Sequence, residues 1–160
     1  MTPRVVDQAG FTVIGIAART SNAREMTGAG VIAEQWARFV QENMAAQIPN
    51  KVDFSIVAVY TDYAGDQGCE YTFVIGARVD SETNAPSGMV ARRVPAGRYA
   101  VFTSEKGPVE KIVVETWQRI WSVAKSAPGG DRAFQTDFEV YDQRAANPRD
   151  AQVDVYVGIR

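Results

Sequence analysis

The chain has 160 residues, of which 46% are hydrophobic and 22% are charged, a balance that predicts a globular fold and excludes disorder. Its formal net charge of −2, with Lys and Arg scattered along the chain, argues against direct nucleic-acid binding. The chain contains no histidine, which excludes Ser–His and Cys–His nucleophiles and removes the commonest ligand of catalytic zinc.

Other absences narrow the class of protein further. The chain has no apolar run long enough to span a membrane, and MTPRVVDQAG at its start lacks the apolar core of a signal peptide. The single cysteine, Cys69, cannot form an internal disulfide. The glycines of GAG, residues 28–30, lack the lysine of a phosphate-binding loop and indicate a flexible approach to a helix. We expect a cytoplasmic protein without metal or cofactor.

The first half of the chain is predicted to form three strands and one helix. The strands are FTVIGIAAR (11–19), DFSIVAVYTDY (53–63) and EYTFVIGARV (70–79). The helix lies between the first two, with Thr27 as its N-cap and Pro49 closing the segment. Its apolar residues recur at helical spacing: Ile32, Trp36, Phe39, Val40 and Met44.

The second half repeats this order after the linker-like DSETNAPSG (80–88). Its strands are VARRVPAGRYAVFTS (90–104), FQTDFEVYDQ (134–143) and QVDVYVGIR (152–160). The helix has Pro108 in its first turn, and SAPGGD stops it. The apolar residues of this helix are Val113, Trp117, Ile120, Trp121 and Ala124.

The two halves are related in sequence as well as in pattern. A shift of 81 residues places VIAEQWARFV on IVVETWQRIW and SIVAVYTD on TDFEVYDQ, without a gap. We therefore predict an α+β fold of tandem strand–helix–strand–strand repeats, at about 11–81 and 89–160, with pseudo-two-fold symmetry. Each half alone has too little core, so one antiparallel sheet with two amphipathic helices is expected, with a cleft between the halves.

One position breaks the symmetry of the repeat. Glu139 stands in the apolar strand DFEVYD, where the first copy has Ala58. If Phe138 and Val140 meet the helix, Glu139 and Tyr141 occupy the other face of the sheet and can line the cleft. A carboxylate there would be desolvated unless it is paired, and a bound cation would pair it.

Two alternatives to a cation site remain open at this stage. Glu139 could lie on a wet sheet face, or it could pair across strands with Arg92, Arg93 or Arg98. The tryptophans carry a similar ambiguity, because aromatic residues at helical spacing are common in cores. Equivalent positions favour a shared packing role for Trp36 and Trp117, whereas Trp121 replaces an aliphatic residue of the first copy and is a candidate for a role in one half.

The order of several segments resembles the gyrase-inhibitor-like effector-binding family, which includes AraC-type effector-binding domains. These segments are YTFVIGARV, VPAGRYAVF, the helix with TWQRIW, DFEVY and VDVYVGIR, and together they cover about residues 11–160. In the family the final strand commonly ends in an apolar–Pro–apolar run, whereas the final strand of this chain ends in VYVGIR.

The resemblance implies a single effector-binding domain over 1–160 that holds bulky, lipophilic and often cationic ligands in an aromatic cleft. The glutamate of the family's Phe-Glu-x-Tyr strand, here Glu139, would contact the ligand's charge. Many members are sensory domains of transcription regulators, but no helix-turn-helix segment is present here, so a stand-alone module for sensing or sequestration is expected. The expected ligand-binding residues are Glu139, Trp121, Trp117, Tyr141, Tyr60 and Tyr71, followed by Trp36, Phe102 and Tyr99.

Two other functions remain open. A hydrolase of reactive small molecules could use Glu139 as base with Tyr141 or Tyr99 as hydrogen-bond donor, although a non-enzymatic protein is preferred. A partner-binding inhibitor or transcription co-regulator is the third hypothesis, acting through a DNA-binding regulator. A homodimer is also compatible with the sequence.

Overall fold

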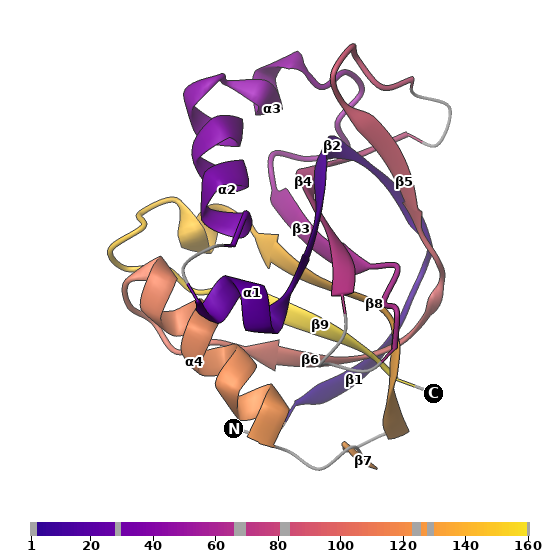
Figure 1. Cartoon of the computed structure of the whole chain (residues 1–160), viewed down its shortest axis with the longest axis vertical. Coiled ribbons are helices and arrows are strands. Elements are labelled where there is room, and N and C mark those ends of the chain that lie inside the picture. The colour runs from indigo at the N-terminus through magenta and orange to yellow at the C-terminus, as the bar shows by residue number, and fades with distance from the viewer. Residues whose placement is uncertain are drawn as a thin grey trace.

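A computed structural model of the chain describes residues 3–27, 30–65, 70–80, 84–122, 126–127 and 130–159. Its strands form one antiparallel sheet in the order β1-β6-β9-β8-β3-β4-β2-β5, and β7 pairs with β8 (Figure 1). The strands are β1 (Arg4–Gln8), β2 (Phe11–Ser21), β3 (Ile56–Thr61), β4 (Glu70–Val79), β5 (Val90–Val94), β6 (Gly97–Thr103), β7 (Ser126–Ala127), β8 (Gly130–Tyr141) and β9 (Asp154–Ile159). The helices are α1 (Asn22–Met26), α2 (Ile32–Gln41), α3 (Met44–Gln47), α4 (Val109–Ser122) and the 3₁₀ turn η1 (Gln143–Ala145).

The sheet closes on itself through one long pairing between two ribbons of chain. The first ribbon is β1 followed by β2, and the second is β5 followed by β6. β1 pairs with β6 and β2 pairs with β5 in the same register, from Arg4↔Val101 at one end to Gly15↔Val90 at the other. The two ribbons run side by side along the right and the bottom of Figure 1, and their pairing closes the sheet, although β1 and β5 do not pair with each other.

The strand order confirms the predicted α+β repeat. β2, β4 and β3 of the first half occupy one side of the sheet, and β6, β9 and β8 occupy the other side in mirrored order. The equivalent strands β3 and β8 pair with each other at the centre. The two halves therefore meet along the strand that carries Glu139.

The predicted elements agree with the structure in kind and differ at several boundaries. The strand predicted at 70–79 is β4, and the segment 90–104 is two strands rather than one. The first helix is interrupted at Asn43, whose φ of 50° ends α2 and begins α3. β1, α1 and β7 were not predicted.

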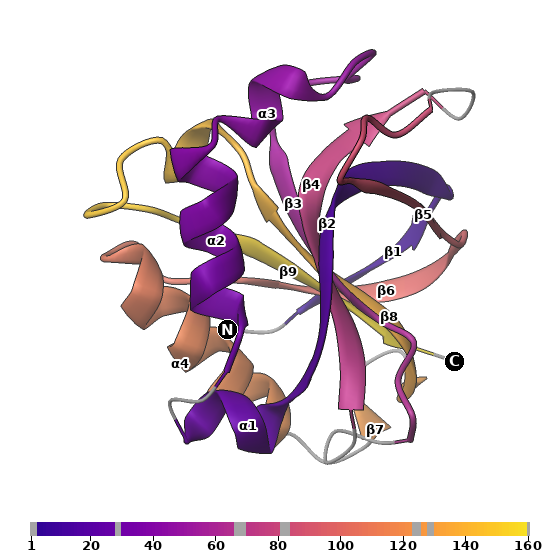
Figure 2. The ribbon, with the colours of Figure 1, turned by 45° about the horizontal axis from the view of Figure 1, so that its top comes forward.

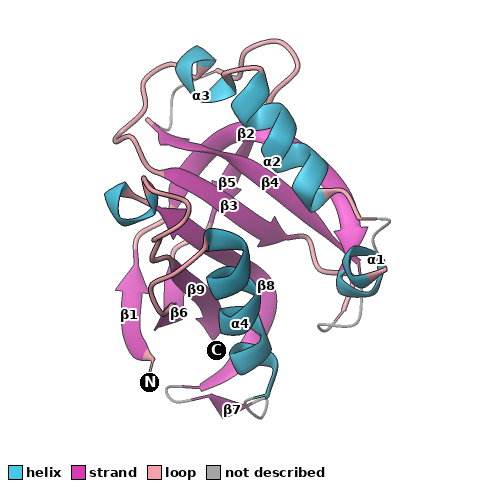
Figure 3. Ribbon diagram, turned by 90° about the vertical axis from the view of Figure 1, so that its left-hand side faces the viewer, coloured by secondary structure: helices cyan, strands magenta, loops and turns pink. Residues whose placement is uncertain are grey.

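The sheet has an apolar core on each face. The inner face encloses one cluster within the closed sheet, and the outer face is covered by α2 and α4, which lie on the same side of the strands (Figures 2 and 3). The inner cluster consists of Val13, Val57, Val59, Val74, Val94, Tyr99, Phe138 and Val140. Phe138 and Val140 thus face inward, and the expectation that they meet the helix is wrong. Glu139 and Tyr141 lie on the helical side instead.

The N-terminus of α2 is held by a carboxylate from the preceding helix. Thr27 was the predicted N-cap, but α2 begins after Val31, which makes no side-chain capping bond. Glu25 of α1 accepts hydrogen bonds from the backbone N–H groups of Val31 and Ile32, at 2.8 and 3.1 Å. The buried Thr20 hydroxyl donates to the same carboxylate at 2.5 Å. Glu25 therefore satisfies donors that a helix N-terminus leaves open.

Some sequence predictions concern residues outside the described ranges. Cys69, Gly28 of the GAG segment and Pro128 of the helix stop are among them, as is part of the predicted linker. No helix within the described ranges is long and apolar enough to cross a membrane.

Candidate functional site

Glu139 lies at the centre of the outer sheet face and is almost fully buried, with 1% of its surface exposed. Its register partners are Ala58 on β3 and Val155 on β9, both completely buried. The methyl group of Ala58 leaves room beside the glutamate. The repeat thus supplies a long side chain from one half and a short one from the other at the same place.

Three neutral donors hold the carboxylate of Glu139. The indole Nε1–H of Trp117 donates to Oε2 at 2.6 Å, and the hydroxyl of Tyr60 donates to the same oxygen at 2.8 Å. The hydroxyl of Tyr141 donates to Oε1 at 2.6 Å. These donors come from α4, β3 and β8, so elements of both halves converge on one side chain.

Within the described residues, no cationic side chain lies within ion-pair distance of Glu139. The three arginines that the sequence offered as partners are engaged elsewhere. Arg92 pairs with Asp62 at 2.5 Å, Arg98 pairs with Asp7 at 3.4 Å, and Arg93 donates to the hydroxyl of Thr12 at 3.5 Å. Both alternatives to a buried, cation-free carboxylate are therefore wrong.

Burial sets the protonation behaviour of this cluster. Desolvation raises the pKa of Glu139 above its usual range, and the hydrogen bonds from Tyr141, Trp117 and Tyr60 oppose that rise without cancelling it. Desolvation and the nearby Glu139 raise the pKa of Tyr60 and Tyr141 well above the ordinary tyrosine value. Both phenols therefore keep their protons at neutral pH.

Aromatic rings surround the carboxylate on the helical side. The ring of Tyr60 packs edge-on against Tyr71, Phe73 and Trp117, at centroid distances of 5.5, 5.3 and 5.3 Å. Such contacts add to the area that each ring buries. Two partly buried tryptophans extend these ring contacts. Trp36 of α2 meets Tyr141 at 4.7 Å, and Trp121 lies 6.1 Å from Trp117.

The structure thus brings together most of the predicted site residues. Glu139, Tyr60, Trp117 and Tyr141 are joined by hydrogen bonds, and Tyr71, Trp36 and Trp121 pack onto their rings. Phe102 shares the outer face but lies beyond Val155, its register partner.

Tyr99 is not part of this group. It points into the inner cluster, packs against Phe138 at 5.2 Å and donates to the carbonyl of Pro95 at 3.3 Å. The prediction that Tyr99 is a wall of the same cleft is wrong. Side chains alternate between the two faces along a strand, and on β6 Tyr99 lies on the inner face whereas Phe102 lies on the outer face. Conversely, Phe73 and Tyr63 were missed. Phe73 alternates in phase with Tyr71, and that spacing was the available signal.

A second buried carboxylate on the same face is already neutralised. Asp137, two residues from Glu139, pairs with Arg132 at 2.8 Å. Its other contacts are the Tyr63 hydroxyl at 2.5 Å and the backbone N–H of Gly158 at 2.8 Å. The pairing of β8 with β9 is irregular between Arg132 and Asp137, and the Asp137 side chain accepts a bond there from the neighbouring strand. Asp137 therefore has a structural role that Glu139 lacks.

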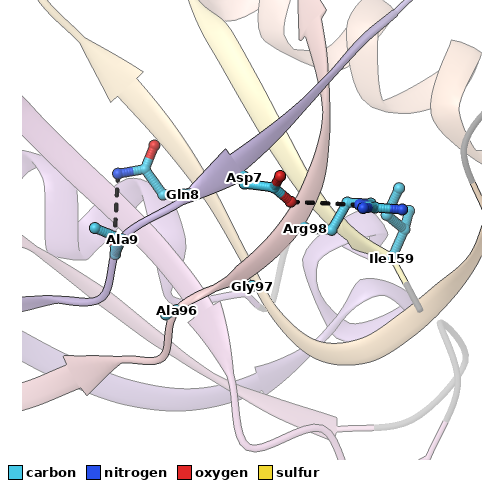
Figure 4. Close-up of a pocket in the computed structure, with 7 residues that line it drawn as sticks. All are labelled: Asp7, Gln8, Ala9, Ala96, Gly97, Arg98 and Ile159. Carbon is cyan, nitrogen blue, oxygen red and sulfur yellow. Dashed lines mark hydrogen bonds and ion pairs between the residues drawn. The ribbon is translucent and has the colours of Figure 1, made fainter.

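Neither Glu139 nor its hydrogen-bond donors line two surface depressions found among the described residues. Figure 4 shows one at the corner where β1 meets β6, near the Asp7–Arg98 ion pair. It is lined by Asp7, Gln8, Ala9, Ala96, Gly97, Arg98 and Ile159, none of which is a predicted site residue. The described residues also contain no group of three or more His, Cys, Asp or Glu side chains that could hold a metal ion.

The chain is similar to known proteins in sequence and in structure. Residues 4–159 match the family model of Cass2, described as an integron-associated effector binding protein. The chain is 41% identical over 147 residues to the putative transcriptional regulator protein YobU of Bacillus subtilis (strain 168), covering 91% of this chain and 90% of that protein.

Two solved structures have the same fold. The integron cassette protein VCH_CASS2, from the mobile metagenome of Vibrio cholerae, aligns with a TM-score of 0.77 and 25% identity, over 99% of this chain and 96% of that chain. The structure of SAV2435 bound to tetraphenylphosphonium aligns with a TM-score of 0.79 and 17% identity, over 100% of this chain and 94% of that chain.

Proposed function

The chain belongs to the family of integron-associated effector-binding proteins, and from that premise we propose that it binds bulky lipophilic organic cations, whose charge Glu139 compensates. The single observation that carries the proposal is the buried carboxylate of Glu139, held by three neutral donors without a cation among the described residues. An unpaired carboxylate in an apolar core is costly. Such a group is retained where a ligand supplies its counter-charge.

The surrounding rings suit a ligand that is both lipophilic and cationic. Tyr60, Trp117 and Tyr141 present aromatic faces and edges next to the carboxylate, and Trp36 and Trp121 extend the apolar surface toward solvent. A cation over such rings gains about 0.5–2 kcal/mol from cation–π attraction. A hard, strongly hydrated ion would gain little from them, because it would lose its water without recovering apolar contact.

Access requires the aromatic side chains to move. Glu139 is covered in this structure by Trp117 and by the tyrosines that donate to it. We expect the partly buried rings of Trp36, Trp121 and Tyr141 to turn aside when a ligand enters, because they already border the surface. A site lined by movable rings accepts ligands of different outline, as expected for sensing or sequestration of several compounds.

Similar proteins support this proposal. SAV2435, which shares the fold, is bound to tetraphenylphosphonium in its solved structure, a lipophilic cation of the kind proposed. YobU is described as a putative transcriptional regulator, which supports a role in effector sensing. The order of segments that resembles gyrase-inhibitor-like domains supports the same ligand class. In this proposal, a DNA-binding partner or a second copy of the chain would respond to the ligand-bound form of the protein.

The experiment is a calorimetric titration with tetraphenylphosphonium, using native protein, Glu139→Gln and Glu115→Gln. Glutamine fits the cage, because its carbonyl can accept from Trp117 and its amide can donate to the Tyr141 hydroxyl. We expect Glu139→Gln to lose about 30-fold or more in affinity, since removing one partner of a buried charge pair costs about 2–5 kcal/mol. Glu115 is exposed on α4, and its variant has the same net charge but should bind as the native protein does. Equal affinity of all three proteins would disprove charge compensation.

A hydrolase remains the second candidate on one observation. The Tyr141 hydroxyl lies 2.6 Å from Glu139, the base and donor arrangement that such an enzyme needs. Tyr99, the other donor considered, lies on the inner face. Turnover of a strained-ring electrophile that Glu139→Gln abolishes would support catalysis, and binding without turnover would favour the effector-binding role.

A further inference from the structure

We propose that the site exchanges a cation for a proton: when empty it holds Glu139 as a neutral acid with the proton on Oε1, and a permanent cation enters as that proton leaves to solvent. The inference rests on the proposed function and specifies the charge state of the site before and after binding. The observations behind it are the hydrogen bonds that Trp117, Tyr60 and Tyr141 make to the two carboxyl oxygens.

Oε2 is the less favourable of the two oxygens for the proton. It accepts from the indole of Trp117 at 2.6 Å and from the hydroxyl of Tyr60 at 2.8 Å. An indole N–H can only donate, so Oε2 must keep accepting from Trp117 in either state. The hydroxyl oxygen of a protonated carboxyl is a weaker acceptor than a carbonyl or carboxylate oxygen, so protonation at Oε2 would weaken the shortest contact on that oxygen.

Oε1 can carry the proton without loss of a hydrogen bond. Among the described residues its hydrogen-bond partner is the Tyr141 hydroxyl at 2.6 Å, and a hydroxyl either donates or accepts. The protonated Oε1 donates to the Tyr141 oxygen, and the phenolic hydrogen rotates away. The heavy atoms keep their places in both states, so one cage serves the acid and the carboxylate.

The groups that face Glu139 favour the neutral acid in the empty site. The donors from β3, α4 and β8 are uncharged, Tyr71 of β4 packs behind Tyr60, and Val155 of β9 is apolar. The nearest charged residue on its own strand face, Asp137, is paired with Arg132 and supplies no net positive charge. Burial raises the pKa of Glu139 in agreement with this geometry. Net charge in the apolar site is zero before and after exchange.

The exchange balances in atoms and charge. The Oε1–H bond breaks, its electron pair stays on the carboxylate, and the proton passes to buffer while the cation takes its place. Below the pKa of the empty site, affinity for a permanent cation therefore rises about tenfold per pH unit, and it levels off above that pKa. A neutral ligand of similar shape gains nothing from the pH change.

Calorimetry measures the released proton directly. Tetraphenylphosphonium is titrated in two buffers of different ionisation enthalpy, at a series of pH values that begins near the ordinary glutamate pKa of 4.5 and extends to about pH 8.5. Because phosphonium has no exchangeable proton, a buffer-dependent heat reports a proton from the protein. We expect release of about one proton at the acidic end, falling toward zero at the alkaline end. Glu115→Gln should behave as the native protein, and Glu139→Gln should release no proton.

An infrared measurement tests the empty site independently. The difference spectrum between native protein and Glu139→Gln should contain a carboxylic-acid carbonyl band at acidic pH that disappears as pH rises. Binding with a flat pH profile and no proton release overturns the exchange but leaves the proposed function intact, as does absence of the band throughout. Failure of phosphonium to bind at any pH overturns both.

Discussion

Ala58 and Glu139 are direct register partners on the two central strands, and they are also the residues that the 81-residue shift superposes. The pseudo-two-fold axis therefore passes between them. Their equivalence explains how a single carboxylate can stand at the centre of the molecule. One half provides the charge, and the other provides the space next to it.

A second carboxylate at position 58 should be poorly tolerated. Ala58 is completely buried on the face that Glu139 shares, so Ala58→Glu would place two acids side by side. One of two neighbouring carboxyls must stay protonated, because their like charges repel. We expect Ala58→Glu to be less stable than Ala58→Gln by about 1–3 kcal/mol at alkaline pH, with a smaller gap at acidic pH. Urea denaturation of both variants measures the gap, which should not vary with pH if position 58 does not share the environment of Glu139.

The stability of the native protein should fall with rising pH through the titration of Glu139. Its pKa is raised above the ordinary value of 4.5, so the folded state keeps a proton that the unfolded chain has already lost. The stabilisation is complete below 4.5 and disappears as pH rises through the folded-state pKa, with a slope of at most about 1.4 kcal/mol per pH unit. Glu139→Gln lacks this dependence. The difference between the two proteins in urea denaturation isolates it, and parallel curves would show that Glu139 has an ordinary pKa.

The carboxylate cap of α2 predicts a non-additive pair of substitutions. Glu25→Ala removes the acceptor for Val31 and Ile32 and should cost about 0.5–2 kcal/mol. A Cβ on Gly30 would lie 2.2 Å from a Glu25 carboxylate oxygen, so Gly30→Ala should displace the same cap. We expect Gly30→Ala to cost little in a protein that already carries Glu25→Ala. Thermal denaturation of the single and double variants tests this double-mutant cycle, and additive losses would show that the two residues act separately.

Two strand glycines should differ sharply in their tolerance of alanine. A Cβ on Gly76 would lie 2.0 Å from the carbonyl oxygen of Ile14, a backbone atom that cannot turn away. Gly97 has only the Tyr99 ring near its Cβ position, at 4.0 Å. Gly76→Ala should therefore destabilise by about 3 kcal/mol or more, and Gly97→Ala by under about 1 kcal/mol. Chemical denaturation provides the comparison, and equal losses would contradict the close approach of β2 and β4.

Ligand affinity should respond to the outer aromatic residues and ignore the inner ones. Trp121 packs on Trp117 at the outer face, and we expect Trp121→Ala to weaken tetraphenylphosphonium binding about 3- to 30-fold through lost ring contact. Tyr99 faces the inner cluster, so Tyr99→Phe should leave affinity unchanged. Fluorescence or calorimetric titration of both variants decides the matter. A strong effect of Tyr99→Phe would mean that the ligand reaches the inner face.

Much of the fold was predictable because the repeat and the strand periodicity are local signals. The strand 70–79 alternates clearly and lies where it was predicted. The closure of the sheet was not predictable, because it depends on how the ribbons bend between β1 and β2 and between β5 and β6. No short-range pattern encodes that bend, and β1 was missed for the same reason.

The face assignment shows where periodicity stops being informative. Alternation correctly placed Glu139 and Tyr141 on one face and Phe138 and Val140 on the other. It could not say which face meets the helices, because both faces of this sheet are buried against apolar layers. Tyr99 is a different case, since it alternates out of phase with Phe102 and the same rule would have separated them.

The closed pairing of the two ribbons limits how another protein could detect occupancy. A partner that recruits an extended segment needs an unpaired strand edge, and among the described strands of this order such edges belong to β1 and β5, at the two ends and several strands away from Glu139 on β8. A change that reports ligand binding is then expected on the face of the protein where side chains move when the ligand binds. A binding partner should accordingly recognise the surface of α2 and α4, where displacement of Trp36 or Trp121 would change the contour of the molecule.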